Sequence, residues 1–451
     1  MSAIDAVVDD EMPGLISDLQ ALIRQPSVSA KKQGLVECAN LVAETMRRAG
    51  ISSEVIHLDD KGVPPIVCGE VKSRSNPNRT ILFYNHYDVQ PEEPAELWKD
   101  KPFSGKVDGN YVYGRGSADD KGELITRIKA VEYFLKKTGD VPCNVKFMVE
   151  GEEEIGSVHI DQYLNKYRDR LLCDGVIWEF GYVDAKDRPI ISLGMKGLLY
   201  VELIARGPTR DAHSSLAVLI ENPAWLLVYA LATMRDQNGR ILIKDWYKEV
   251  RAFTRDELAV ISKEPFDEKE FKQEYGIGRF VKNAKATDIK KALVGMPTCN
   301  IAGFNSGYIG EGAKTVLPSQ AVVKIDFRLV PDMVPEKQLE RLKRHLKMKG
   351  FGDIEVKFIH GESAARTPIR DPFVRQVQQA AKETFGSAIT SVSSAGTGPM
   401  YSFVKVLNAP CISIGGTYMF ARIHSPNEFA RIDLLNKTTK CIGRIMERFA
   451  G

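Results

Sequence analysis

The chain has 451 residues, of which 43% are hydrophobic and 27% are charged. This length exceeds one ordinary hydrophobic core and predicts two or three domains, and the hydrophobic content excludes wholesale disorder. Lys and Arg number 62 against 59 Asp and Glu, for a formal net charge of +3. The near-even balance excludes the single-sign field typical of proteins that bind nucleic acid or anionic membranes.

The seven cysteines are far apart and form no CxxC pair, so neither a disulfide framework nor a thiolate zinc site is indicated. Residues 1–12 are acidic and lack the apolar stretch of a signal peptide. The longest apolar run, residues 224–232, is far shorter than a membrane span and predicts a buried helix. We therefore expect a cytoplasmic protein without membrane association.

Helical and strand patterns alternate through the first 190 or so residues and again after residue 367. Residues 80–84 form a short continuous apolar run, which is typical of a strand covered on both faces. This alternation predicts an α/β fold with a doubly wound, mainly parallel sheet. Helices are predicted at 14–24, 35–48, 122–136, 161–169, 372–385 and 433–449, and strands at 53–58, 66–71, 80–84, 144–149, 175–178 and 409–414.

The pattern changes between residues 194 and 366. Residues 198–205 and 321–329 alternate with the two-residue period of half-exposed strands. Residues 335–349 predict a helix, and the charge-rich residues 244–291 predict a solvated helical insert. We therefore expect one α/β domain, residues 1–193 and 367–451, interrupted by an inserted α+β domain at 194–366.

His86 and Asp88 follow the predicted strand at 80–84. Ligand sites in open α/β sheets lie at the carboxyl ends of strands. A histidine there can bind a metal through one ring nitrogen while a carboxylate holds the other. Taken alone, a histidine beside an aspartate is more often an ordinary surface pair.

Asp119 and Asp120 end a glycine-containing loop, residues 113–118, just before a predicted helix. The loop is not a dinucleotide-binding fingerprint, because Asp119 stands where the last glycine of that pattern must be. The two aspartates are either helix N-caps or acidic metal ligands.

Four glutamates, at positions 150, 152, 153 and 154, follow the strand predicted at 144–149. Such crowded carboxylates repel one another and favour a nearby cation. One can bind a metal while its neighbour acts as a general base. Glu179 also ends a predicted strand, and His424 follows a glycine turn.

Two histidines and three carboxylates suit a pair of zinc, manganese or cobalt ions. These five motifs, in this order, resemble the M20 family of co-catalytic metallopeptidases, and within it the cytosolic, carnosine-type dipeptidase branch. The resemblance implies a set of metal ligands and two supporting residues. His86 and Glu179 would hold one ion, Glu154 and His424 the other, with Asp119 bridging both across a cis Asp119–Asp120 peptide, Glu153 as general base and Asp88 bracing His86.

The resemblance also implies a homodimer formed by the inserted domain, which serves as a lid. His213 would reach into the partner's active site to stabilise the oxyanion, and Arg328 would bind the substrate's C-terminal carboxylate. The remaining substrate contacts it implies are Thr315, Thr397, Gly398 and His360.

We therefore expect two divalent ions, zinc before manganese or cobalt, and hydrolysis of amide bonds in small peptides with a free C-terminal carboxylate. Glu179 stands where the dipeptidases of this family usually carry Asp, and it resembles the carboxypeptidase and deacylase branches. An N-acyl-amino-acid deacylase or desuccinylase is therefore the alternative. A non-catalytic metal-binding scaffold would lack a ligand or Glu153, and all six residues are present.

Overall fold

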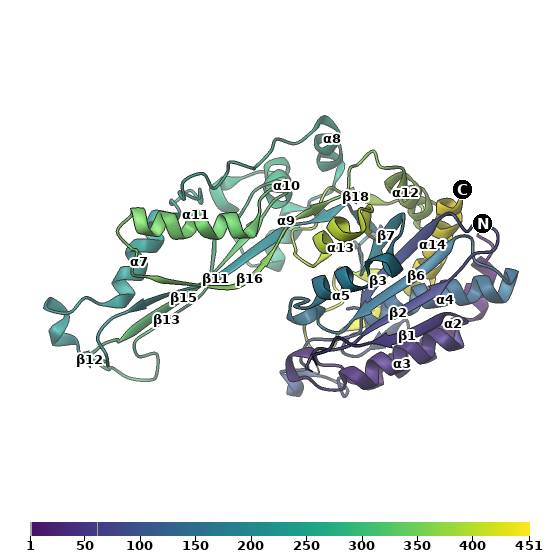
Figure 1. The fold of residues 1–451 in the computed structure, drawn as a ribbon, viewed down its shortest axis with the longest axis horizontal. Helices are drawn as coiled ribbons and strands as arrows, with labels where there is room; N and C mark the ends of the chain where they lie inside the picture. The colour runs from purple at the N-terminus through teal and green to yellow at the C-terminus, as the bar shows by residue number, and fades with distance from the viewer. Residues whose placement is uncertain (1, 61) are drawn as a thin grey trace. The chain divides into compact units, whose positions relative to one another are not determined.

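The computed structural model describes residues 2–60 and 62–451, which divide into two compact units (Figure 1). The first unit holds the chain up to Gly194 together with Arg366–Val392 and Gly398–Gly451. The second holds Met195–Ala365 and the short segment Ser393–Thr397. The boundaries predicted from the sequence, 193/194 and 366/367, lie one residue away from these divisions, and the separate segment at residues 393–397 is not predicted.

The first unit is built on an eight-stranded sheet in the described residues. Its strands lie in the order β1 (Ser52–Ile56), β2 (Ile66–Val71), β6 (Asn144–Glu150), β3 (Thr80–His86), β7 (Gly175–Trp178), β19 (Cys411–Ser413), β9 (Ile190–Ser192) and β18 (Ile389–Ser391). The four middle strands, from β6 to β19, are parallel, which confirms the predicted mainly parallel centre. β1, β2 and β6 pair antiparallel, and so do β19 and β9.

Helices cover both faces of this sheet (Figure 1). One face packs against α2 (Met12–Arg24), α3 (Leu35–Arg48), α4 (Lys121–Thr138), α12 (Pro372–Phe385) and α14 (Ile432–Ala450), which share the main hydrophobic core. The other face carries α5 (Ile160–Lys166), α6 (Arg168–Leu171) and α13 (Met400–Leu407). There the rings of Tyr84 and Trp178 stack, with centroids 4.1 Å apart, and both contact Phe403.

The second unit has a four-stranded antiparallel sheet. The strand order is β13 (Asn300–Ser306), β15 (Gln320–Leu329), β11 (Gly197–Arg206) and β16 (Glu355–Glu362), and α7 (Pro223–Met234) and α11 (Pro335–Met348) pack on one face. As its two-residue period predicts, β15 buries Val323, Ile325 and Phe327 on that face. Arg328 points to the opposite side, because successive strand residues alternate.

The prediction that residues 224–232 form a buried helix is wrong in part. α7 buries Leu227 and Ala230 against the sheet, but Trp225 is 57% exposed and Tyr229 is 56% exposed. An apolar run without helical periodicity does not show which side of a helix meets the core. The charge-rich insert forms α8 (Arg255–Lys263), α9 (Glu268–Glu274) and α10 (Ala286–Gly295), which are largely exposed, as predicted.

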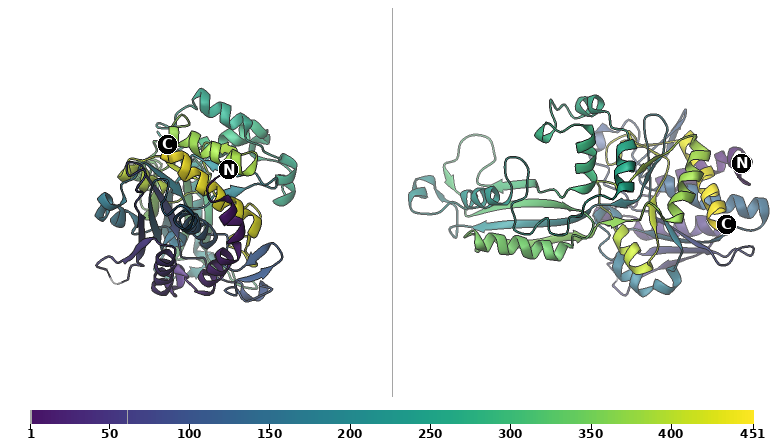
Figure 2. Two further views of the ribbon diagram at one scale, coloured as in Figure 1. Left: turned by 90° about the vertical axis from the view of Figure 1, so that its right-hand side faces the viewer. Right: turned by 90° about the horizontal axis from the view of Figure 1, so that it is seen from above.

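Short elements complete the chain. They are α1 (Asp5–Asp10), β4 (Lys106–Asp108), β5 (Tyr111–Tyr113), β8 (Tyr182–Val183), β10 (Gly194–Met195), β12 (Ala212–His213), β14 (Val316–Leu317), β17 (Ala365–Arg366), β20 (Thr417–Tyr418) and β21 (Phe429–Arg431). The two ends of the chain meet where α1 packs on α14, and Asp5 forms a 2.6 Å ion pair with Arg444 (Figure 2). Across the described residues, no helix combines the length and the apolar character that crossing a membrane requires.

Candidate metal centre

The five expected metal ligands meet at one edge of the first unit's sheet. His86 is the last residue of β3, Glu179 follows β7, and Glu154 lies in the 3-10 turn Glu153–Ile155 after β6. Because β6, β3 and β7 are parallel neighbours, their carboxyl ends lie side by side. Asp119 immediately precedes Asp120 and α4, and His424 lies in the loop between β20 and β21.

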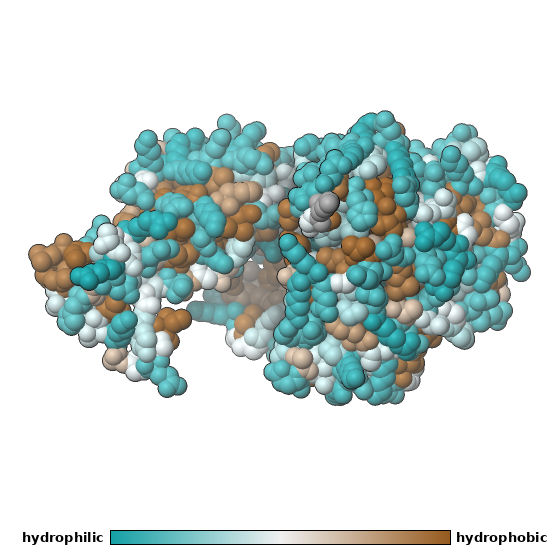
Figure 3. Space-filling view, turned by 60° about the horizontal axis from the view of Figure 1, so that its bottom comes forward, coloured by the Kyte–Doolittle hydropathy of each residue, from teal (hydrophilic) through white to brown (hydrophobic). Residues whose placement is uncertain are grey.

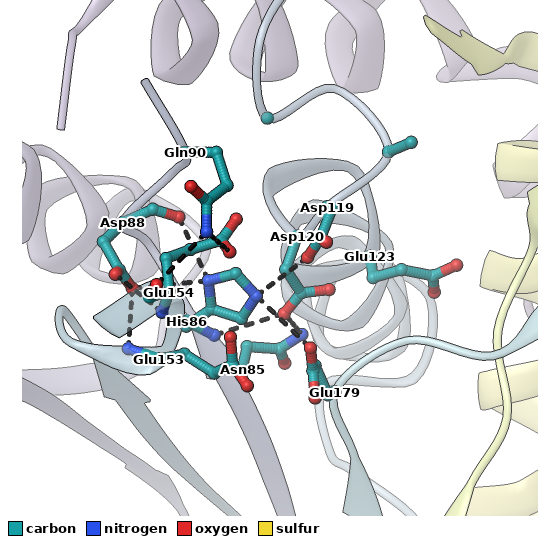
Figure 4. Close-up of polar contacts among 12 residues, drawn as sticks. Asn85, His86, Asp88, Gln90, Asp119, Asp120, Glu123, Glu153, Glu154 and Glu179 are labelled. Atoms are coloured by element: carbon teal, nitrogen blue, oxygen red, sulfur yellow. Dashed lines mark hydrogen bonds and ion pairs between the residues drawn. The ribbon is translucent and has the colours of Figure 1, made fainter. Parts of the chain in front are cut away.

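The five side chains form two clusters that share Asp119. His86 Nε2 lies 2.9 Å from Asp119 Oδ1 and 3.4 Å from Glu179 Oε1. His424 Nε2 lies 3.2 Å from Asp119 Oδ2 and 3.1 Å from Glu154 Oε2. Asp119 therefore presents one oxygen to each cluster, which is the arrangement of a ligand that bridges two ions. Figure 4 shows the side with His86 and Glu179.

The charges of the cluster fit divalent cations. Burial raises the pKa of Glu154 and of Glu179, because the ionised carboxylates lose water. Hydrogen bonds to Asp119 and Glu154 raise the pKa of His424 to about 10. Burial lowers the pKa of His86, but its hydrogen bond to Asp119 helps to raise that pKa well above its usual range, so both histidines favour the positively charged form beside these carboxylates. Ions placed among the same nitrogen and oxygen atoms would supply that charge instead, and this donor set suits zinc, manganese or cobalt.

Asp88 braces both sides of the cluster. Its Oδ1 lies 3.4 Å from His86 Nδ1 and accepts a hydrogen bond from the Glu153 amide at 3.2 Å. Its Oδ2 accepts one from the Glu154 amide at 3.1 Å (Figure 4). The contact with His86 is expected from the sequence, whereas the contacts with the turn are not. Gln90 was not predicted either, and its amide donates to Glu154 Oε2 at 2.8 Å.

The four glutamates after β6 divide into separate environments. Glu150 accepts hydrogen bonds from Tyr84 and Ser157, and burial raises its pKa to about 8. Glu152 pairs with His159 at 2.9 Å. Only Glu153 and Glu154 remain for the metal cluster, so the repulsion inferred from the sequence is relieved by separating the side chains.

Glu153 is half-buried beside the ligands. Burial, followed by the neighbouring charge of Glu179, raises its pKa well above the ordinary range. A raised pKa favours a group that must take up and release a proton near neutral pH. Bound cations would counter part of this rise.

Neither of the two aspartates before α4 caps the helix with its side chain. Asp120 occupies the N-cap position, but its side chain makes no capping hydrogen bond. Its Oδ2 instead accepts from Asn85 Nδ2 at 2.6 Å and from the His86 amide at 3.2 Å. The Asp119–Asp120 peptide is cis, as the family resemblance implies.

Glu179 is held by two groups that the sequence analysis did not assign. Trp178 Nε1 donates to Glu179 Oε2 at 2.7 Å, which leaves Oε1 toward His86. The buried guanidinium of Arg127 donates to the Glu179 carbonyl, and Glu179 adopts a left-handed backbone conformation with φ of 32°. Arg127 sits mid-helix in α4 with no local motif that would reveal this role.

The expected substrate residues of the second unit form two pairs. Arg328 donates to Thr397 Oγ1 at 2.6 Å, and His213 Nε2 lies 3.3 Å from Thr315 Oγ1. His360 lies opposite Tyr200 in the β16–β11 register, and its side chain is half-buried. Gly398 falls in the first unit, just before α13.

Comparison with known proteins identifies the class. Residues 82–448 match the model of Peptidase family M20/M25/M40, and the chain belongs to that family. A Cys-Gly metallodipeptidase of Candida albicans is 29% identical over 84% of this chain and 81% of its own length. The human Beta-Ala-His dipeptidase is 29% identical over 70% of this chain and 64% of its own length.

A solved structure gives the same result at higher identity. An M20 family metallo-carboxypeptidase, Sso-CP2 from Sulfolobus solfataricus, is 38% identical, with a TM-score of 0.90. The match covers 97% of this chain and 99% of that one. The fold and the family expected from the sequence are therefore confirmed, and the chain is a metal-dependent peptidase by family.

The place of Asp119 in both clusters predicts a specific pattern of metal loss. We expect the wild type to retain about two zinc ions after dialysis, Glu179→Ala and His424→Ala about one each, and Asp119→Ala the least. Metal analysis of each variant measures this. Glu150→Gln, which changes a buried carboxyl outside both clusters, is the control and should keep the wild-type content. An Asp119→Ala chain that retains both ions would refute the bridge.

Proposed function

We propose that this protein hydrolyses the peptide bond of dipeptides and other short peptides that end in a free carboxylate. The observation that carries the proposal is the pair of ligand clusters joined at Asp119, with Glu153 beside them. The dipeptidase and carboxypeptidase relatives support it, since both classes act at the last peptide bond of a substrate.

The residues divide the work of hydrolysis. Two divalent ions, which we propose to be zinc, with manganese or cobalt as alternatives, would activate water and polarise the scissile carbonyl. Glu153 takes the proton of the attacking water and delivers it to the leaving amine. Arg328, held by Thr397, binds the terminal carboxylate through its planar guanidinium.

We further propose a homodimer formed by the second unit. α7 presents Trp225, Val228 and Tyr229 to solvent, and the edge strand β13 exposes Ile301 and Phe304. Exposed apolar helix faces and open strand edges are both typical of interfaces. Hydrophobic surface also gathers at the left of Figure 3, where Figure 1 places β12, and Leu216, Val218 and Leu219 are exposed in the segment after β12. His213, exposed beside this segment, would then act in the partner's site.

Glu179 favours one alternative substrate class, N-acyl amino acids. A panel of dipeptides, N-acetyl amino acids and N-succinyl amino acids, assayed with zinc, manganese and cobalt, separates the two. Dipeptides cleaved with the highest kcat/KM support the proposal. Preference for the acyl compounds assigns the deacylase or desuccinylase activity instead.

The cytoplasmic location expected from the cysteine content remains a prediction.

Glu153→Gln tests the proposed base. Removing a general base costs about 10²–10⁴-fold in rate, so we expect kcat to fall by that factor while both ions stay bound. Glu152→Gln is the matched control, because it makes the same change one residue earlier in a carboxylate that pairs with His159. Near wild-type turnover in a Glu153→Gln enzyme with full metal content would show that another group takes the proton.

Arg328 predicts that the substrate's terminal charge matters. Hydrogen bonds to charged groups contribute about 1.5–3 kcal/mol, so amidating the carboxylate should lower kcat/KM about 10–100-fold in the wild type. In Arg328→Met the free and amidated substrates should be cleaved at similar rates. Lys324→Met, on the same face of β15, should keep the wild-type preference. Equal wild-type rates for the two substrates would remove the proposed carboxylate contact.

The dimer is tested by Trp225→Glu, which places a charge in the exposed face of α7. We expect monomers in sedimentation, with native circular dichroism and a loss of turnover of about 10²–10³-fold, the usual effect of losing an oxyanion donor. Lys343→Glu, an exposed change on α11, should remain dimeric. Mixing inactive His213→Ala and Glu153→Gln chains should restore activity, since one site of each mixed dimer is complete. Failure of the mixture to recover activity would place His213 in its own subunit's site.

A further inference from the structure

Glu428 joins the two loops that carry Asp119 and His424. Its side chain is 1% exposed and accepts four hydrogen bonds from the loop before α4. Glu428 Oε1 accepts from the amides of Ala118 at 2.9 Å and Asp119 at 3.1 Å. Glu428 Oε2 accepts from Arg115 at 2.8 Å and from the Gly116 amide at 3.1 Å.

The Asp119 loop depends on this carboxylate for its shape. Gly116 has a φ of 82°, and a Cβ there would lie 2.5 Å from Val89, so the loop must approach its neighbours without a side chain. The Gly114 amide adds a bond to the Glu428 carbonyl at 3.0 Å. The backbone from Gly114 to the Asp119 amide is thereby fixed to Glu428.

Glu428 itself belongs to the loop that carries His424. Glu428 lies four residues after His424, and Asn427 between them accepts from the Lys99 amide at 2.8 Å. The His424 side chain is 51% exposed, so little packing holds it directly. Its backbone adopts a left-handed conformation with a φ of 60°. Its position follows from the anchoring of its own loop.

We propose that Glu428 is a positioning residue that sets the affinity of the centre for metal, because it fixes Asp119 and His424 relative to one another. It contacts the Asp119 amide rather than any ligand atom. Residues that support metal ligands in this way typically contribute about 10–100-fold to metal affinity. The inference rests on the proposed function of the same site.

Glu428→Gln is the sharpest change. It keeps the shape of the side chain but replaces one oxygen with an NH₂ group. Each oxygen of Glu428 accepts two hydrogen bonds, so in either orientation of the amide the NH₂ group would face two N–H donors and lose both bonds. We expect zinc affinity, measured by competition with a chelator, to fall about 10–100-fold. Raising the zinc concentration should then restore most of the activity, because the ligands and Glu153 are intact.

Glu257→Gln is the matched control. Glu257 is 4% exposed and likewise accepts from an arginine, Arg251 at 2.8 Å, and from a backbone amide, Thr254 at 2.8 Å, but it belongs to the second unit. The Glu257→Gln substitution should lower thermal stability without changing zinc affinity. Glu428→Asp, which keeps the charge but retracts it, should show a smaller loss of affinity and decides the case if Glu428→Gln does not fold.

Wild-type zinc affinity in a folded Glu428→Gln or Glu428→Asp chain would overturn the inference, and so would an equal loss in Glu257→Gln. A different result would refute the proposed function. A wild-type chain that binds zinc and cleaves no peptide refutes the peptidase while leaving the role of Glu428 intact.

Discussion

The first unit is organised around one shared carboxylate. Asp119 must offer one oxygen to His86 and the other to His424, two residues separated by most of the chain. Burial alone would raise the pKa of Asp119, yet the hydrogen bonds from the two histidines lower it below its usual range. The geometry of the sheet edge, the loop before α4 and the loop before β21 all serve to keep these three side chains together.

Gathering carboxylates in this way opposes folding unless positive charge is present. The fold offsets part of the cost with neutral donors, including Gln90 on Glu154 and Trp178 on Glu179, and with Arg127 on the Glu179 backbone. The positive charge of the histidines offsets the rest of this cost, and bound divalent ions would supply that charge instead. A net charge of +3 for the chain therefore hides a strongly acidic edge.

Sequence patterns predicted what depends on local periodicity and on residue type. The bounds of β7 and α12 match the predicted ranges. His86, Glu154 and Glu179 were singled out because each stands at or just after the end of a buried strand, and Asp119 and His424 because each follows a glycine-containing turn. Strand direction was harder to predict, because an alternating or apolar pattern indicates a strand but not the strand with which it pairs. The antiparallel pairing of β1 with β2, and of β2 with β6, was therefore not predicted. For α7 the uniform apolar run concealed the exposed face that carries Trp225, since an exposed apolar face has the same residue types as a buried one.

The supporting residues were missed for a different reason. A ligand reveals itself by its type and its place at a strand end, whereas Glu428 acts through backbone amides, which every residue but proline possesses. Its partners lie more than 300 positions earlier, and nothing in their side chains, except the arginine, marks them as donors. Arg127 is similar, because its target is the carbonyl of Glu179 rather than the carboxylate. The candidate ligands of this centre can thus be recognised from sequence, whereas the contacts proposed to set the strength of metal binding arise only in the folded backbone.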